Sequence, residues 1–322
     1  MKSTLAAFAL MLASATAWSC SKSSTAPTEE KPSTPAAPAA AAPAPATPAV
    51  KTYQVNLNPP LKVGQKISLA CDTSTTMDMA IEVSAPQMPA PQKQNQNQKS
   101  SVHLEADAEV LAVNPNGSPK KLSLTFKNIQ ATQNDAPVTG LPQAGDTVVA
   151  EFTDQNAKTF TKNGQPLAPA LPAFVAEVIP VTAQGQSDQD LFGPKEAMPV
   201  GGTWAASPAV IAELAKTGGT ATGLDGVMKL DGIQGEGANQ VATVSGKLKL
   251  TGVSLPLPAG VQATPGDCNI ELSGTFPAAA KGALSESTTM TMTMSAEGDI
   301  NGAHLRMGVN AKRTGTQTIT MP

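Results

Sequence analysis

The chain has 322 residues, of which 40% are hydrophobic, 15% are charged and 3% are aromatic, and its formal net charge is −3. This mild acidity, with no basic cluster larger than Lys120-Lys121, argues against a nucleic-acid partner, because contact with phosphates needs a strongly basic surface. The length would suit about two domains, although β-rich single domains of this size are common.

The first 19 residues predict an export signal. Lys2 gives the segment a positively charged n-region. Residues 5–17 form an apolar run that is far shorter than the roughly 20 residues of a membrane-spanning helix. Trp18, Ser19 and Cys20 follow this run. We therefore expect residues 1–19 to be a signal peptide that is removed on export.

The junction after this run allows two cleavage sites. If Ala17-Trp18-Ser19-Cys20 acts as a lipobox, Cys20 becomes an acylated N-terminus; if Ala15-Thr16-Ala17 is cut by ordinary signal peptidase, the protein is soluble and secreted. We expect the lipid anchor, whose acyl chains gain about 0.8 kcal/mol per buried methylene. We therefore predict that the lipid anchor attaches the protein to the outer membrane or to another membrane surface that faces the periplasm.

Residues 20–50 predict a disordered stalk behind the anchor. Its prolines are Pro27, Pro32, Pro35, Pro38, Pro43, Pro45 and Pro48. Proline at this density removes backbone donors and fixes φ, so extended polyproline conformation prevails over the helix that the intervening alanines would favour. We expect residues 51–322 to form a single β-rich body beyond the stalk.

Alternating apolar and polar residues predict strands throughout this body. From 102 to 112 the even positions are apolar and most odd positions are polar, which is the pattern of a half-buried strand. After the turn Asn114-Pro115-Asn116-Gly117, the alternation resumes at Leu122. Further alternating runs begin near Val148, Val244, Ile270, Met290 and Leu305. Several runs are longer than the usual strand of about five or six residues, which indicates a strongly curved sheet.

One short helix is predicted near the middle of the chain. Ser207 caps it, Pro208 suits its first position, residues 210–214 carry an apolar stripe, and Gly218 ends it. Residues 86–99 are rich in asparagine, glutamine and proline, and we expect them to form a long mobile loop.

The body reads as two similar halves, residues 63–180 and 200–322. Three segments recur in the same order: Val63-Gly64 and Val200-Gly201, residues 121–125 and 247–251, and Gly145-Asp146 and Gly266-Asp267. The recurrence indicates duplication of one strand meander, and its alternative is chance likeness among similar strands. We therefore expect a mostly β fold, a curved antiparallel meander with one short helix. A half-barrel is the first choice and a sandwich is the alternative.

A family resemblance begins at residues 197–204. Pro199, Val200, Gly202 and Trp204 follow the residue order of a P-V-x-x-G-x-x-W signature, and further matches are Gly274-Thr275-Phe276, Gly282, Leu284, Ser287, Met292 and Met294. On these motifs the chain resembles, over roughly residues 51–320, a family of uncharacterised bacterial secreted lipoproteins. The resemblance implies only the exported address and the β architecture, because the family has no established activity.

Cys71 and Cys268 remain once Cys20 is acylated. A leftover pair in an oxidising compartment is a candidate disulfide, and such a bridge would close a long loop. The alternative is two buried free thiols that pack as small apolar residues.

No catalytic, metal or cofactor site is expected. Ser118-Pro119-Lys120-Lys121 and Lys216-Thr217-Gly218 match fragments of penicillin-recognising enzymes, but the first lies in a turn and the second ends a helix. Residues 188–193 begin like a calcium loop, and a solvated linker is the better interpretation, because Phe192 stands where an oxygen ligand belongs. His103 and His304 lie on polar faces of separate predicted strands, where we expect surface residues.

Methionines give the one hint of a ligand. The predicted strands contain Met77, Met79, Met228, Met290, Met292, Met294 and Met307, mostly on the apolar side. Methionine fills cores and also lines adaptable apolar cavities. The sequence therefore predicts a non-enzymatic envelope lipoprotein with a structural or protein-interaction role. Its alternative is a carrier that binds a lipid or another apolar ligand in a methionine-lined concave sheet.

Overall fold

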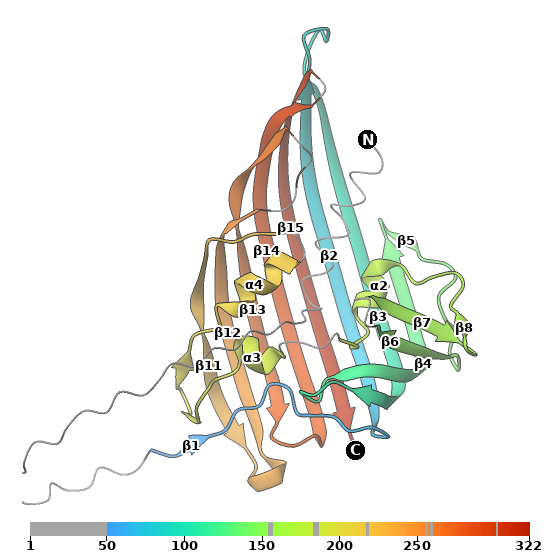
Figure 1. The fold of residues 1–322 in the computed structure, drawn as a ribbon, viewed down its shortest axis with the longest axis vertical. Coiled ribbons are helices and arrows are strands. Elements are labelled where there is room, and N and C mark those ends of the chain that lie inside the picture. Colours follow the sequence, from blue (N-terminus) through green and yellow to red (C-terminus); the bar gives the residue numbers. More distant parts are fainter. Residues whose placement is uncertain are drawn as a thin grey trace, which may run out of the picture.

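The computed structural model describes residues 50–153, 157–182, 187–216, 219–254, 257, 260–300 and 302–322. The predicted signal peptide, Cys20 and the stalk up to residue 49 lie outside these residues. The described chain forms one open sheet of 13 antiparallel strands and a separate pair of two-residue strands (Figure 1).

Eight long strands make up most of the sheet. They are β2 (Lys66–Ser84), β3 (Gln92–Val113), β4 (Pro119–Gln133), β11 (Gly223–Gln234), β12 (Val241–Val253), β13 (Val261–Pro277), β14 (Gly282–Ile300) and β15 (Ala303–Met321). Short strands extend it: β5 (Ala136–Pro137), β6 (Thr147–Phe152), β7 (Lys158–Lys162), β8 (Gln165–Pro166) and β10 (Thr203–Trp204). The separate pair is β1 (Thr52–Tyr53) and β9 (Met198–Pro199).

The beginning and the end of the body meet in the middle of the sheet. The strand order is β10-β11-β12-β13-β14-β15-β2-β3-β4-β6-β7-β8, with β5 beside β4. β15 pairs with β2 from His304↔Ser84 to Thr320↔Ser68. The last strand of the chain thus lies beside the first long strand, while the sequence likeness of the two halves stays a prediction.

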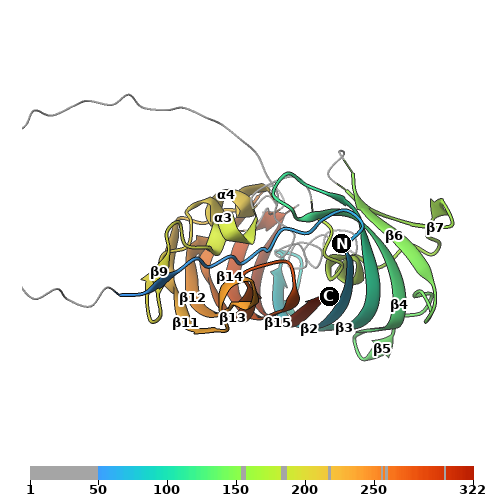
Figure 2. The same ribbon diagram turned by 90° about the horizontal axis from the view of Figure 1, so that it is seen from below.

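The sheet curves into a half-barrel whose concave side carries the helices (Figure 2). Strands have a right-handed twist, so neighbouring strands rotate relative to one another and a sheet of many long strands coils. The two edges do not pair with each other, since β10 and β8 end the strand order. The predicted curved antiparallel meander is confirmed, and a half-barrel is found in place of a sandwich.

Alternation divides the sheet into a buried concave face and a wet convex face. On β3 the even positions from 102 to 110 are buried, and the odd positions between them are not. The buried side chains pack with Leu122, Leu124 and Phe126 of β4 in one core cluster. Burying an apolar side chain of this size contributes roughly 1.5–3 kcal/mol relative to exposure. The period of two therefore predicted the core correctly on these strands.

The convex face carries cross-strand ion pairs. Lysine ammonium groups lie 2.7 to 2.9 Å from carboxylates in Lys121–Glu151, Lys247–Glu271 and Lys249–Asp267. Exposed pairs of this kind contribute about 0–1 kcal/mol each. Packing on the concave face, and not these pairs, therefore stabilises the sheet.

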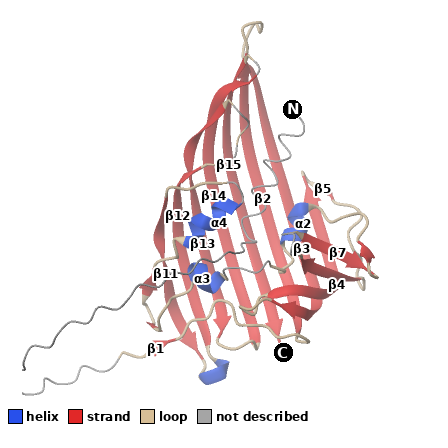
Figure 3. Ribbon diagram, in the orientation of Figure 1, coloured by secondary structure: helices blue, strands red, loops and turns tan. Residues whose placement is uncertain are grey.

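Three short helices lie over the concave face in the described chain, where one was predicted (Figure 3). They are α2 (Ala173–Glu177), α3 (Asp188–Phe192) and α4 (Ala209–Lys216), and a 3-10 turn, η2 (Gly237–Asn239), joins β11 to β12. None of these described helices combines the length and the apolar surface that crossing a membrane requires.

α4 is the predicted helix, and the other two were missed. Ser207 Oγ accepts a hydrogen bond from Ala209 N (3.3 Å), while the expected stop at Gly218 lies outside the described residues. α3 replaces the predicted linker at residues 188–193, because Ser187 and Asp190 form a capping box and Leu191 is buried beneath the helix. Helices as short as α2 and α3 give no sustained apolar period in the sequence.

Residues 86–99 were predicted to be a loop; the prediction is correct for residues 86–91, which turn between β2 and β3, and wrong for residues 92–99, which belong to β3. β2 pairs with β3 from Val83↔Gln92 to Lys66↔Glu109 without a shift in register. β4 pairs with β3 only from Ser100 onward, so residues 92–98 lie at a free edge and most of their side chains meet water. Backbone pairing does not require apolar side chains, so the pattern of hydrophobic residues does not predict that residues 92–98 form a strand.

Two leucines of β3 test the assignment of the faces. Leu104 is fully buried, whereas Leu111 is 37% exposed. Leu104→Ala should lower the free energy of unfolding by about 2–5 kcal/mol, because it removes buried methylenes and leaves a cavity. Leu111→Ala should lower it by about 0.5 kcal/mol or less. Chemical denaturation measures both values, and equal losses would contradict the assignment.

Candidate functional site

A cavity of about 300 Å³ lies between the concave face and the segments that cross it. Its floor comes from β2 and from β12 to β15, and its cover comes from α3, α4 and residues 177–182. Its apolar walls include Leu250, Val253, Cys268, Ile270, Met290 and Met292. Protein interiors are otherwise close-packed, so an unfilled space of this size is a candidate ligand site. We call it the central cavity.

The seven methionines that the sequence singled out divide into three groups. Met290 and Met292 line the central cavity. A second group packs in the same hydrophobic cluster without lining the cavity: Met77, Met79, Met294 and Met307. Met228 belongs to a separate cluster. Aliphatic side chains of β12 and β13 form much of the wall that the methionines were expected to supply.

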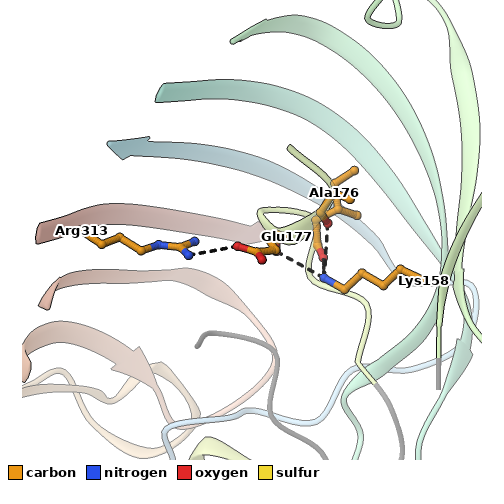
Figure 4. Close-up of polar contacts among 5 residues, drawn as sticks. Lys158, Ala176, Glu177 and Arg313 are labelled. Atoms are coloured by element: carbon orange, nitrogen blue, oxygen red, sulfur yellow. Dashed lines mark hydrogen bonds and ion pairs between the residues drawn. The ribbon is translucent and has the colours of Figure 1, made fainter. Parts of the chain in front are cut away.

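A buried ion pair forms part of the cavity wall (Figure 4). Arg313 Nη1, on β15, donates to Glu177 Oε2, at the end of α2, over 3.0 Å. The two side chains are only 9% and 12% exposed, so both charges have left bulk water. Removing one partner of such a pair costs about 3–5 kcal/mol, because the other charge stays buried. The pair therefore fixes α2 to the middle of the sheet.

Lys158 on β7 holds the same segment from the other flank (Figure 4). Its ammonium donates to the carbonyl oxygens of Ala176 (3.3 Å), Glu177 (3.3 Å) and Ile179 (2.9 Å). These carbonyls lie at or just after the C-terminal end of α2, where the negative ends of the peptide dipoles attract a cation. Lys158 and Arg313 thus tie one covering segment to two separate parts of the sheet.

Burial moves the pKa values of these groups toward neutrality. It raises the pKa of Glu177 to about 7, although the positive charges of Arg313 and Lys158 oppose the change. It lowers the pKa of Lys158 to about 8. Burial, and then the carboxylate of Asp188, raise the pKa of Glu286 to about 7 in the same cavity wall. The cavity wall therefore changes its charge close to neutral pH.

The candidate disulfide is absent, and the two cysteines are free and buried. Cys71 lies on β2 and Cys268 on β13, with β14 and β15 between them. Three strand spacings amount to about 14 Å along the sheet, whereas bridged Cα atoms lie within about 7 Å. Both thiols line the central cavity, and burial raises the pKa of each to about 11, which keeps them protonated.

The two histidines do not share a site. His103 Nδ1 lies 2.7 Å from Asp72 Oδ1, and His304 Nδ1 lies 3.1 Å from Asp299 Oδ1. His103 is opposite Asp72 and His304 is opposite Ser84, so roughly 40 Å of β2 separates them. Among the residues that the structure describes, no group of three His, Cys, Asp or Glu side chains is placed to hold a metal ion.

The charged residues of the cavity were missed in the sequence, although a signal was present. Arg313 follows Leu305, Met307, Val309 and Ala311 at the same alternation, so it occupies the apolar face of β15. Glu177 is the single charge in the run Phe174-Val175-Ala176-Glu177-Val178-Ile179. A charge in phase with an apolar face needs a buried partner. The partner itself was not predictable, because 136 positions separate the two residues.

Comparisons with known proteins assign no family. No family model and no curated protein matches the chain. The outer membrane protein OprG from Pseudomonas aeruginosa matches with a TM-score of 0.22 and 7% identity, over 82% of this chain and 99% of OprG. The outer membrane protease OmpT from Escherichia coli matches with a TM-score of 0.16 and 8% identity, over 78% of this chain and 96% of OmpT. At these scores the likeness to outer membrane proteins supports no argument about function.

Glu177 should make the stability of the fold depend on pH. Its pKa is about 7 in the fold against 4.5 in the unfolded chain, so the folded state keeps a proton that the unfolded state loses. The free energy of unfolding should therefore fall as pH rises from 4.5 to about 7, by up to about 3 kcal/mol. Glu177→Gln should flatten this part of the profile, and chemical denaturation at a series of pH values measures it. Glu109→Gln, at an exposed carboxyl, is the control, and an unchanged slope in Glu177→Gln would contradict the assignment.

Proposed function

We propose that this protein is an exported, lipid-anchored protein of the cell envelope that binds a lipid or another apolar ligand in the central cavity. The observation that supports the proposal is the cavity itself, about 300 Å³ of unfilled space with mostly apolar walls. Ligand pockets usually measure about 300–1,000 Å³. A body with a purely structural role would gain stability by filling this space with side chains.

The walls suit an amphiphilic ligand. Methionine and aliphatic side chains from β12 to β14 offer adaptable apolar surface for a chain or a ring. Arg313, Glu177 and Lys158 offer charged groups for a polar end. Burial of the apolar part would drive binding at roughly 25 cal/mol per Å², and the polar contacts would fix its orientation. The proposed role requires no catalytic step.

The cavity favours the second of the two roles that the sequence suggested. From the sequence alone, a structural or protein-interaction role was preferred, because no residue pattern reveals a cavity. A carrier came second, and it requires a sizeable apolar pocket. The central cavity supports this second role.

Filling the central cavity should abolish ligand binding. Gly315 on β15 lines the cavity, and the nearest atom to an added Cβ is Thr73 Cγ2 at 3.4 Å, so a side chain fits there. Gly315→Leu should therefore fold and occupy the cavity. Titration with N-phenyl-1-naphthylamine, an apolar fluorescent probe, should show saturable binding to the native chain and at least about tenfold weaker binding to the variant.

Gly308→Leu is the matched control for this experiment. Gly308 lies on the same strand, its position alternates with the buried Val309, and nothing lies within 4 Å of an added Cβ. The control should bind the probe as the native chain does. Trp204 gives a second readout, because its Nε1 donates to the carbonyl oxygen of Phe192 (2.6 Å), which lines the cavity. No saturable binding to the native chain, or equal binding by both variants, would contradict the proposal.

The lipid anchor is tested at Cys20. Cys20→Ala should move the protein from the membrane fraction to the soluble fraction, because the acyl chains on Cys20 would supply the affinity for the bilayer. Cys71→Ala changes a buried thiol of the body and should leave the protein on the membrane. Sedimentation of Cys20→Ala with the membranes would count against acylation.

A further inference from the structure

β3 has a free edge near the tip of the β2–β3 hairpin (Figure 1). On one side, residues 92–98 pair with β2, from Val83↔Gln92 to Met77↔Gln98. On the other side, β4 pairs with β3 only from Ser100 onward. Residues 92–98 thus have no neighbouring strand on that side within the described chain. We call this segment the hairpin edge.

Alternate residues of the hairpin edge turn their backbone groups outward. In an antiparallel sheet, the N–H and C=O of one residue point to one neighbour, and those of the next residue point to the other. The Lys99 carbonyl points away from β2 and accepts from Asn134 N (2.8 Å), so Lys93, Asn95 and Asn97 share its orientation. Within the described residues, the backbone groups of these three have no hydrogen-bond partner on the outer side. Such an edge is a template for another strand.

The sequence of the hairpin edge is complementary to itself. Residues 92–98 read Gln-Lys-Gln-Asn-Gln-Asn-Gln. An antiparallel copy related by a two-fold axis at Asn95 gives the opposed pairs Gln92–Gln98, Lys93–Asn97, Gln94–Gln96 and Asn95–Asn95. Side-chain amides donate and accept at once, so identical amides can pair with each other. This register also brings the outward backbone groups of one copy to those of the other.

The charges of the hairpin edge do not oppose this pairing. Lysines protect an edge by repelling a like edge. Here Lys93 Nζ lies 3.6 Å from Glu82, and Lys99 Nζ lies 3.8 Å from Asp135, so acids of the same chain offset both charges. In the register with the axis at Asn95, no lysine stands opposite a lysine.

We propose that two copies of this chain pair through the hairpin edge, antiparallel and about a two-fold axis at Asn95, so that their sheets join into one. Pairing of the same patch on both partners closes the assembly at two copies. Seven residues on each side bury little surface, so the association in solution is weak and depends on concentration. The pairing is independent of any ligand in the central cavity.

Disulfide crosslinking tests the position of the axis. Opposed residues of a hydrogen-bonded pair have Cα atoms about 5.5 Å apart, which a disulfide spans. In the full chain carrying Cys20→Ala, Asn95→Cys should form a covalent dimer on oxidation by copper phenanthroline and air. Lys93→Cys is the matched control on the same edge. Its symmetry mate lies roughly 13 Å away, so it should crosslink at least about tenfold more slowly.

Asn95→Pro provides the second measurement. The Asn95 N–H points away from β2, so proline there leaves the β2–β3 pairing intact and removes a donor from the pairing of two copies. Analytical ultracentrifugation over a concentration series should show dimers of the native chain and only monomers of the variant, with the same far-ultraviolet circular dichroism. Equal crosslinking at positions 95 and 93, crosslinking at neither, or dimers that persist in Asn95→Pro would overturn the proposal.

Discussion

The pairing of β15 with β2 holds the two ends of the body in one sheet. It joins 17 residue pairs without a shift in register. Without it, the strands before residue 170 and those after residue 200 would form two separate flanks, each with a long exposed edge. The central cavity depends on the same junction, because Cys71 and Thr73 of β2 and Arg313 of β15 face it together.

Curvature explains why empty space and buried charge occur together. A half-barrel has a hollow that its own side chains do not fill, so other segments must cross it. A crossing segment brings backbone carbonyls out of water, and these need donors. Lys158 supplies them for the end of α2, and the Arg313–Glu177 pair fixes the segment's position. The curvature that leaves room for a ligand therefore also places charged side chains in the cavity wall, and these would orient a bound ligand.

Prediction from the sequence succeeded where one face of a strand is buried and failed where burial is not the cause of structure. Residues 102–110 were assigned correctly, because their alternation reports burial directly. Residues 92–98 were missed, because backbone pairing alone keeps them extended. The methionines marked the right face of the sheet, yet only Met290 and Met292 reach the cavity. The location of a hollow depends on contacts between residues far apart in the chain, such as that of Arg313 with Glu177, and no local pattern records them.

The central place of β15 has a consequence for how the protein is made. Ala303, the first residue of β15, follows Lys66, the first residue of β2, by 237 positions. Nearly the whole body is therefore synthesised before the second neighbouring strand of β2 exists. Sheets built on such distant pairings form slowly. Until β15 has been synthesised, the edge of β2 that it covers in the fold has no neighbouring strand. Any event that interrupts synthesis before β15 is made therefore leaves a long open strand edge in the middle of the molecule, which is a template for aggregation.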